Sequence, residues 1–573
     1  MPNQVNKRWK TCPANGFDDA FLKELGISPL TAQILLNRGI CEIDQARHFL
    51  SPALADLPDP FLLKDIDKAV SRILRAILLK EKIILFGDYD VDGTTATALL
   101  LLFLKKTGAL VDFCLPHRFK DGYGLNLEAV KKIHARGAKL MITADCGISN
   151  ADEIRWAADH GLEVIITDHH EVPEILPPAL AILNPKQPGC PYPFKELAGV
   201  GVAFNLVIAL RSRLRQEGFW AGGEVPNLKE YLDLVALGTV ADVVPLGGVN
   251  RILVKHGLGQ LTHSARPGIV ALKEASGLGG MPVDTTGINF RLAPRINAAG
   301  RMTEADDAVR LLLTEDGEEA KRIAAHLGQL NTHRQKIEER ILAEARKMIT
   351  LADTAPMKKS LVLASPDWHP GVIGIVASRL KEEYFRPIIL IALKGNLGQG
   401  SGRSIEPFSL YEGLKACRAS METFGGHEQA AGLVIRAECI PDFTRAFEEV
   451  VCARLREEDF IPLLPIDAVA RLDQMNESFL AELESLSPFG VGNPEPVLRL
   501  EKLTVLGSSK VGESHLRLRI KEGRITRKAI GFHMGSRHPL AGGNMKMAFT
   551  PSLGFFQGRR TLDLRVIDLR PSD

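Results

Sequence analysis

From about residue 51 to about residue 265, short apolar runs alternate with helical stretches. This alternation predicts an α/β domain with a mostly parallel sheet and helices on both faces. Because the carboxyl ends of parallel strands meet at one edge, side chains that follow the runs should gather there. The predicted strands are residues 82–86, 139–143, 164–167 and 181–183, and the predicted helices are 94–106, 127–136 and 151–160.

An acidic segment follows the first run directly. Residues 87–95 read GDYDVDGTT and place Asp88, Asp90 and Asp92 within five positions. Carboxylates this close repel one another unless cations neutralise them, and hard divalent metals prefer oxygen ligands. A calcium loop is an alternative, but it needs flanking helices and a glutamate roughly six residues after the glycine. Here a strand precedes the segment, and Leu99 occupies the position of that glutamate.

Three further motifs lie at the ends of predicted elements. Asp145 follows the second run, the triplet of Asp168, His169 and His170 follows the third, and Asp242 follows an apolar helical segment. A single aspartate at a strand end usually caps a helix. Recurrence at several strand ends instead predicts one metal-binding cleft, and carboxylates with one or two imidazoles suit Mn²⁺ or Mg²⁺ better than zinc.

We therefore predict a centre for two Mn²⁺ or Mg²⁺ ions. Two such ions stabilise both oxygens of an in-line displacement at phosphorus, which indicates phosphodiester hydrolysis. Asp145 is predicted to bridge the ions and His170 to donate to the substrate phosphate; together with His169 they form the predicted catalytic group. Which of the three aspartates in 88–92 bind metal directly stays open. The candidate metal ligands are Asp88, Asp90, Asp92, Asp145, His169 and Asp242.

The rest of the chain suggests further domains. Residues 317–348 carry apolar side chains at three- and four-residue spacing without proline, which predicts a long helix connecting two domains, an ordinary surface helix being the alternative. A second α/β unit follows, and short alternating segments near the C-terminus predict a small β-barrel. The expected domains are 1–50 (N-terminal segment), 51–265 (catalytic), 266–350 (linking), 351–458 (second α/β) and 459–573 (barrel).

Composition indicates the cellular compartment and the kind of nucleic-acid surface to expect. The eight cysteines are scattered without a C-x-x-C pair, and no apolar signal segment or membrane-length run is present, so we expect a cytoplasmic protein. The formal net charge is only +2, so a nucleic-acid surface has to be local. From residue 501 onward there are 14 lysines and arginines against six acidic residues, a basic excess suited to a nucleic-acid backbone. Phe532, Phe549, Phe555 and Phe556 are candidates for base stacking, although at least half of them should be barrel core.

The triplet 168–170 with the acidic segment upstream resembles the DHH phosphoesterase superfamily. Within it, the chain is similar to the RecJ family of single-strand-specific 5′→3′ exonucleases. The resemblance covers nearly the whole chain after residue 50, and an additional C-terminal domain of some relatives is expected to be absent. The further segments that carry it are PHRF (116–119), GYGL (122–125), RLAPRINAAGR (291–301), HPGVIG (369–374), SGRS (401–404), GGH (425–427), SPFG (487–490) and GNPEP (492–496).

The resemblance implies a DHH domain, a DHH-associated domain and an OB-like barrel, acting on single-stranded DNA in recombination and repair with release of 5′-mononucleotides. It also implies a single-strand-binding protein and a RecQ-type helicase as partners. We expect a monomer without membrane attachment. A small-substrate superfamily member (an oligoribonuclease, a pyrophosphatase or a cyclic-dinucleotide hydrolase) is the alternative enzyme, and a DNA-binding scaffold without activity is the alternative of another class.

Several segments are predicted to bind DNA phosphates. Residues 425–427 suit this role because a helix is predicted at 428–432, and backbone amides at a helix start attract anions. Arg295 and Arg301 are predicted to flank a turn of small residues. A surface arginine paired with a carboxylate is the alternative for each arginine. The predicted phosphate-binding residues are Arg118, Arg295, Asn297, Arg301, Ser401, Arg403, Gly425, Gly426 and His427.

Overall fold

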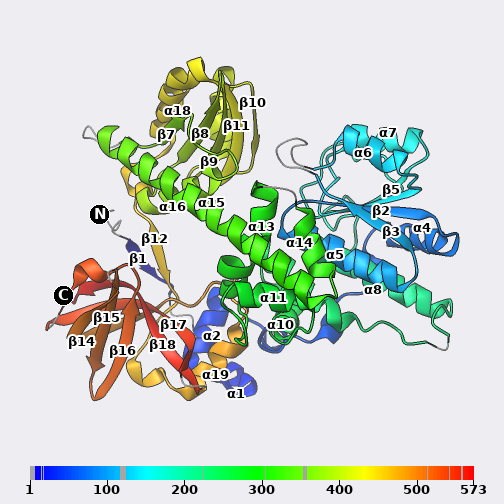
Figure 1. Ribbon diagram of the computed structural model, residues 1–573. Helices are drawn as coiled ribbons and strands as arrows, with labels where there is room; N and C mark the ends of the chain where they lie inside the picture. Colours follow the sequence, from blue (N-terminus) through cyan, green and yellow to red (C-terminus); the bar gives the residue numbers. More distant parts are fainter. Residues whose placement is uncertain are drawn as a thin grey trace. The chain divides into compact units, whose positions relative to one another are not determined.

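The computed structural model divides the chain into two compact units (Figure 1). One contains residues 11–328 and 466–573, and the other contains residues 329–465 with the residues before 11. The structure describes residues 7–13, 16, 18–116, 124–221, 223–302, 305–352, 358–512, 514–540, 542–556 and 559–572.

A five-stranded parallel sheet forms the centre of the first unit, which confirms the predicted parallel sheet and adds one strand to the four predicted. Its order is β3-β2-β4-β5-β6, so the direction of strand addition reverses between β2 and β4. Such a reversal is the point at which open α/β sheets bind ligands. The edge strand β3 was missed because its mixed, half-exposed sequence carries no apolar run. The strands are β2 (Lys82–Gly87), β3 (Leu110–Cys114), β4 (Leu140–Ala144), β5 (Glu163–Thr167) and β6 (Ala181–Leu183).

Helices cover both faces of this sheet (Figure 1). α6 (Leu127–Ala135) and α7 (Ala151–Asp159) pack on one face. α4 (Ile66–Leu78), α5 (Val91–Lys106) and α8 (Gly199–Gln216) lie on the other. α5 is apolar nearly all round because it lies between the sheet and further helices, where few of its side chains reach water.

A run of helices leads out of the sheet domain. The long helix predicted at 317–348 is α15 (Gly317–Ala352), whose first turns belong to the first unit and whose remainder belongs to the second. The preceding helices are α9 (Leu232–Ala241), α10 (Gly248–Thr262), α11 (Pro267–Ala275), α12 (Thr285–Gly287), α13 (Ala293–Met302) and α14 (Asp306–Leu313).

The C-terminal part of the first unit is a closed barrel. β14 pairs with β15 and also with β17, which closes the ring, while β16 and β18 run parallel. This five-stranded arrangement is that of an OB-fold and confirms the predicted barrel. Phe549 is buried core, Phe532 is 48% exposed, and the side chains of Phe555 and Phe556 lie outside the described residues. The elements are β13 (Ala468–Val469), α19 (Glu477–Leu486), β14 (Leu498–Val511), β15 (His515–Glu522), β16 (Ile525–Gly531), β17 (Asn544–Phe556) and β18 (Arg559–Pro571).

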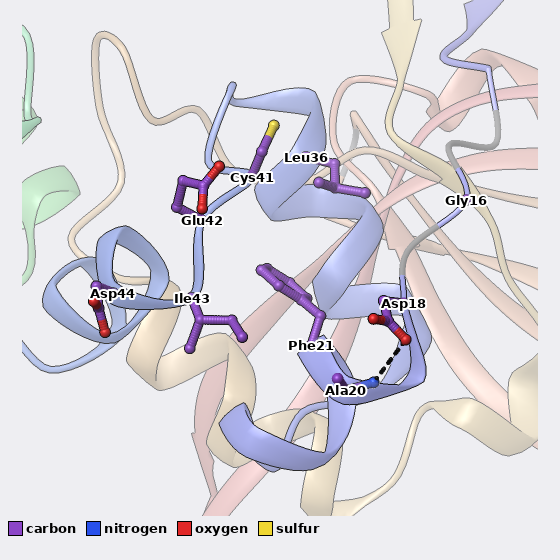
Figure 2. Close-up of a pocket in the computed structure, with 9 residues that line it drawn as sticks. All are labelled: Gly16, Asp18, Ala20, Phe21, Leu36, Cys41, Glu42, Ile43 and Asp44. Carbon is purple, nitrogen blue, oxygen red and sulfur yellow. Dashed lines mark hydrogen bonds between the residues drawn. The ribbon is translucent and has the colours of Figure 1, made fainter.

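Three N-terminal helices share the hydrophobic core of the barrel: α1 (Asp19–Leu25), α2 (Pro29–Asn37) and α3 (Ile43–Leu50). A cavity of about 540 Å³ lies among them, with Phe21, Leu36 and Ile43 on its apolar side (Figure 2). None of the candidate metal ligands lines this cavity.

The second unit contains a five-stranded sheet of order β10-β11-β9-β8-β7, in which only β7 and β8 are parallel. The helix predicted at 428–432 was wrong: the glycines there belong to a β-hairpin between β10 and β11. In the described residues no helix is long and apolar enough to cross a membrane. The elements are β7 (Leu361–Ser365), α16 (Ile373–Tyr384), β8 (Ile388–Lys394), β9 (Leu397–Arg403), α17 (Leu410–Ala416), β10 (Thr423–Gly426), β11 (Ala430–Arg436) and α18 (Ile440–Arg454), with β1 (Arg8–Thr11) paired to β12 (Leu463–Ile466).

Candidate metal centre

Three neighbouring strands each deliver a motif residue to the same edge of the parallel sheet. The backbone ladder continues one residue past each strand. The amide of Asp88 donates to the carbonyl of Ala144 at 3.1 Å, and the amide of Asp145 donates to that of Thr167 at 2.9 Å. Asp88 and Asp145 therefore lie side by side at the reversal point between β2 and β4, and the triplet that follows β5 lies next to Asp145.

Asp242 approaches this edge from the C-terminal end of α9, as predicted. The Nε2 atom of His169 lies 3.2 Å from Oδ1 of Asp145 and 3.4 Å from Oδ2 of Asp242. These three atoms are buried and have no hydrogen-bond partner among the described residues. Buried polar atoms are nearly always satisfied. A divalent cation is the partner that would satisfy two carboxylates and an imidazole together.

The ligand atoms form groups, each with all its atoms within 4.8 Å of one another. One group is Asp88, Asp90 and Asp145, a second is Asp92, His169 and Asp242, and a third joins Asp145 to His169 and His170. Oxygen with one or two imidazole nitrogens is a donor set that fits Mn²⁺ or Mg²⁺. The residues present therefore fit two such ions, with Asp145 in the first group and also next to His169 of the second.

Two of the three clustered aspartates, Asp92 and Asp90, have different surroundings. Oδ2 of Asp92 accepts the amide of Gly199 at 2.6 Å, and Oδ1 accepts that of Val200 at 2.8 Å. Asp92 therefore caps the N-terminus of α8, where a negative charge is favourable. Asp90 caps its own helix α5 through the amide of Gly93 at 3.0 Å. Asp92 thus combines an anchoring contact with its place in the second ligand group.

Burial sets the protonation of these groups. Burial, reinforced by the negative charge of Asp92, raises the pKa of Asp242 to about 9. Burial and the nearby Asp90 likewise raise the pKa of Asp92 to about 7, and burial with Asp92 raises the pKa of Asp145 well above its ordinary value. Burial and the neighbouring His170 lower the pKa of His169 to about 4, so its imidazole is neutral at pH 7 and able to bind metal.

Asp168 orients the second histidine, a role that the sequence analysis did not assign. Its Oδ1 lies 2.7 Å from Nδ1 of His170 and also accepts the amides of His169 and His170, while Oδ2 accepts the amide of Ile148 at 2.9 Å. Burial opposes the charged carboxylate, but these hydrogen bonds outweigh it and lower the pKa of Asp168. A carboxylate on Nδ1 fixes the direction of the ring and turns Nε2 away from Asp168. The sequence signal for this orienting role was Asp168 itself, which directly precedes the two histidines.

Helix α8 approaches Asp145 so closely that its first residue has to be glycine. A Cβ at Gly199 would lie 2.6 Å from Oδ1 of Asp145, so any larger residue would displace that carboxylate. Asp145 itself adopts a left-handed backbone with φ of 65°, a conformation that aspartate tolerates better than most residues. Sequence reasoning missed Gly199 because only the packing of α8 makes it necessary.

Arg295, Asn297 and Arg301 lie on helix α13, so the predicted turn of small residues between Arg295 and Arg301 was wrong. Alanine is a good helix former, and the small residues here let α13 pack closely. A Cβ at Gly300 would lie 3.0 Å from the carbonyl oxygen of Tyr89, in the loop between Asp88 and Asp90. The structure therefore brings α13 against the loop that contains Asp88, Tyr89 and Asp90. Arg118 lies outside the described residues.

The remaining predicted phosphate residues lie in the second unit. Ser401 and Arg403 are on β9. Gly432 of β11 pairs with Ser401 on one side and with Gly425 of β10 on the other. Gly426 ends β10, and His427 is exposed in the hairpin turn. The described partners of the Arg403 guanidinium are all neutral, namely the hydroxyls of Ser378 and Ser401 and the carbonyl of Gly402. A partly buried cation with neutral partners is a suitable anion site.

Comparisons with known proteins match the same three parts of the chain. Residues 82–239 match the DHH family, N-terminal domain; residues 358–453 match the DHHA1 domain; and residues 466–568 match the RecJ OB domain. The single-stranded-DNA-specific exonuclease RecJ of Bacillus subtilis (strain 168) is 41% identical over 96% of this chain and 69% of its own length. That of Haemophilus influenzae is 36% identical over 92% and 95%.

Solved structures agree with this similarity. RecJ from Thermus thermophilus in complex with Mn²⁺ has a TM-score of 0.83 at 34% identity, covering 99% of this chain and 80% of that one. The complex of the same protein with Mg²⁺ has a TM-score of 0.77 at 32% identity, covering 99% and 79%.

Proposed function

The chain belongs to the RecJ family of the DHH phosphoesterase superfamily, and from this membership we propose that it is a metal-dependent exonuclease specific for single-stranded DNA. The observation that carries the proposal is the set of three buried, unsatisfied ligand atoms of Asp145, His169 and Asp242 at the strand edge. We further propose 5′→3′ polarity and release of 5′-mononucleotides, in DNA recombination and repair.

Mn²⁺ or Mg²⁺ bound there supplies an activated water and stabilises the charge that develops on the phosphate oxygens. Asp88, Asp90 and Asp145 would hold one ion, and Asp92, His169 and Asp242 the other, with Asp145 also next to the second group. The neutral imidazole of His169 presents Nε2 as a ligand. Placing these groups on three rigid strand ends and a helix end fixes their geometry before substrate binds.

His170 is proposed to donate a hydrogen bond to the scissile phosphate. Although burial opposes its charge, the hydrogen bond with Asp168 raises the pKa of His170, so that the ring carries more positive charge near pH 7 than an isolated histidine. The same bond holds the ring in one orientation. An oriented donor with increased positive charge suits a phosphodiester whose negative charge increases during attack.

Three surfaces are proposed to hold the DNA strand. Arg295, Asn297 and Arg301 lie on helix α13, which packs against the loop that contains Asp88, Tyr89 and Asp90. In the second unit, Arg403 with Ser401 and the glycine hairpin 425–427 forms an anion site. On the barrel, exposed positions of β15 carry the basic residues Arg517, Arg519 and Lys521, with Lys528 opposite Arg519 on β16.

We also propose a monomeric cytoplasmic protein with the five domains named above. The eight cysteines are scattered along the sequence without a C-x-x-C pair, which supports a reducing compartment. A single-strand-binding protein and a RecQ-type helicase are the proposed partners, on the basis of family membership.

A digestion assay tests the proposal. Single strands labelled at the 5′ or the 3′ end, the matching duplex, and dinucleotides are each incubated with the protein and Mn²⁺. We expect mononucleotides from the single strand, early loss of the 5′ label and an intact duplex. Cleavage of dinucleotides with long single strands left intact would instead favour the small-substrate alternative, and early loss of the 3′ label would reverse the polarity.

A further inference from the structure

The loop that leads into the barrel, residues 487–494, contacts the loop that carries the metal ligand Asp242. We propose that the 487–494 loop is a positioning element for Asp242, so that the C-terminal part of the chain sets the geometry of the metal centre. This inference rests on the proposed metal-dependent function and adds residues remote in sequence to the machinery of that site.

Two contacts join the loops directly. The amide of Leu246 donates to the carbonyl of Val491 at 2.7 Å. The Leu246 side chain is 2% exposed, and a Cβ at Gly490 would lie 2.7 Å from its Cδ1. A Cβ at Gly492 would lie 3.3 Å from Cβ of Pro245. A methyl group added at Gly490 would therefore have to displace the buried Leu246 side chain, and one at Gly492 would crowd Pro245; these two residues lie only four and three positions after Asp242.

The 487–494 loop is itself rigid. Asn493 is fully buried, and its Nδ2 donates to the carbonyls of Leu486 at 2.9 Å and Pro488 at 2.7 Å. The backbones of Gly490 and Asn493 exchange hydrogen bonds of 2.9 and 3.1 Å. A loop tied in this way transmits a displacement to its neighbour instead of absorbing it.

Helix α10, which begins directly after the Asp242 loop, provides the second attachment. The buried guanidinium of Arg251 donates to the carbonyls of Ser485 at 2.8 Å and Ser487 at 3.0 Å. Lys255 donates to the carbonyl of Ser487 at 2.9 Å. On the other side, Asn250 donates to the carbonyl of Pro245 at 3.1 Å. The Asp242 loop is thus held between its own helix and the 487–494 loop.

Holding matters at this position because the residue directly after Asp242 has a strained backbone and an exposed side chain. Val243 has a left-handed backbone with φ of 63° and a side chain that is 60% exposed. A β-branched residue in that conformation persists only where its surroundings enforce it. Metal ligands tolerate little displacement, and loss of a supporting contact typically weakens metal binding about 10- to 100-fold.

Titration of the metal-free protein with Mn²⁺, following free Mn²⁺ by electron paramagnetic resonance, tests the inference without DNA. Gly490→Ala places a methyl group against Leu246. We expect one of the two ions to bind about tenfold or more weakly and the other to bind as in the wild type. Gly507→Ala, on β14 of the same barrel, is the matched control because nothing lies within 4 Å of its Cβ.

In a Leu246→Ala background, Gly490→Ala should lower the Mn²⁺ affinity only slightly, because the side chain that the added methyl group would meet is gone. The double variant is therefore compared with Leu246→Ala alone. Should Gly490→Ala fail to fold, Gly492→Ala replaces it, compared with Gly523→Ala, which has a similar left-handed backbone but open space around its Cβ. Wild-type affinity for both ions in the folded variant, or equal weakening in its control, would overturn the inference. Two bound ions without cleavage of single strands would overturn the proposed function alone.

Discussion

The carboxylate of Asp92 accepts the backbone amide of Gly199 at 2.6 Å, which ties the first turn of α8 to the first turn of α5. The same glycine leaves the space in which the Asp145 carboxylate lies. One helix N-terminus therefore anchors one aspartate of the centre and makes room for another.

Replacing Asp92 with asparagine should loosen the start of α8. The side-chain amide would face a backbone amide, and an unsatisfied buried donor costs about 1–3 kcal/mol. Hydrogen exchange at residues 199 and 200 should accelerate about ten- to hundredfold. Asp90→Asn is the control, since Asp90 caps α5 through Gly93 and should alter exchange there only. Unchanged exchange at Gly199 in Asp92→Asn would contradict the anchoring role.

Asp145→Asn should abolish metal-dependent cleavage while sparing DNA binding. Asparagine tolerates the left-handed backbone at this position, so the change removes a charge without new strain. We expect the cleavage rate to fall by at least about a hundredfold. Binding of single strands, measured by fluorescence anisotropy without metal, should change little. Asp152→Asn, on an exposed aspartate of α7, should leave both unaffected; cleavage by Asp145→Asn at the wild-type rate would refute the ligand assignment.

Metal affinity should rise with pH. Because the pKa of Asp242 in the metal-free protein is raised to about 9, its carboxyl is protonated near neutral pH and an ion must displace that proton. Raising the pH removes the competing proton, so Mn²⁺ affinity should increase up to about tenfold per unit until the pH reaches that pKa. Anaerobic calorimetric titrations at several pH values measure this slope, which gives the number of protons released per bound ion. In Asp242→Asn that number should fall by about one. An equal slope in the variant would place the titrating proton elsewhere.

Arg403→Gln should weaken DNA binding by the second unit. Its guanidinium has neutral described partners, so its charge is available for a phosphate. Loss of one phosphate contact should reduce the salt dependence of binding by about one unit of slope. Arg436→Gln, on β11 of the same sheet, is the control because Arg436 already pairs with Glu422 at 2.6 Å. The same salt slope in Arg403→Gln as in the wild type would place Arg403 outside the DNA path.

The sequence predicted the parts of the centre that depend on local order. An apolar run followed by Asp88, Asp145 or the 168–170 triplet predicts a strand with its ligand at the carboxyl end, and parallel strands bring such ends together. Local reading failed where tertiary contacts chose between structures. The glycines near 425–432 form a hairpin because β9 pairs with β11, and the small residues before Arg301 form a helix because α13 packs on Tyr89.

Sequence alone thus determined that carboxylates and imidazoles converge at one sheet edge, since strand periodicity and polarity are local properties of the chain. Only the tertiary structure decided how each group is used there. It placed Asp92 on the amides of α8, His170 on Asp168, and the 487–494 loop against the Asp242 loop. These contacts join residues that no local pattern pairs, and their strength depends on burial and on distances that only the folded chain sets.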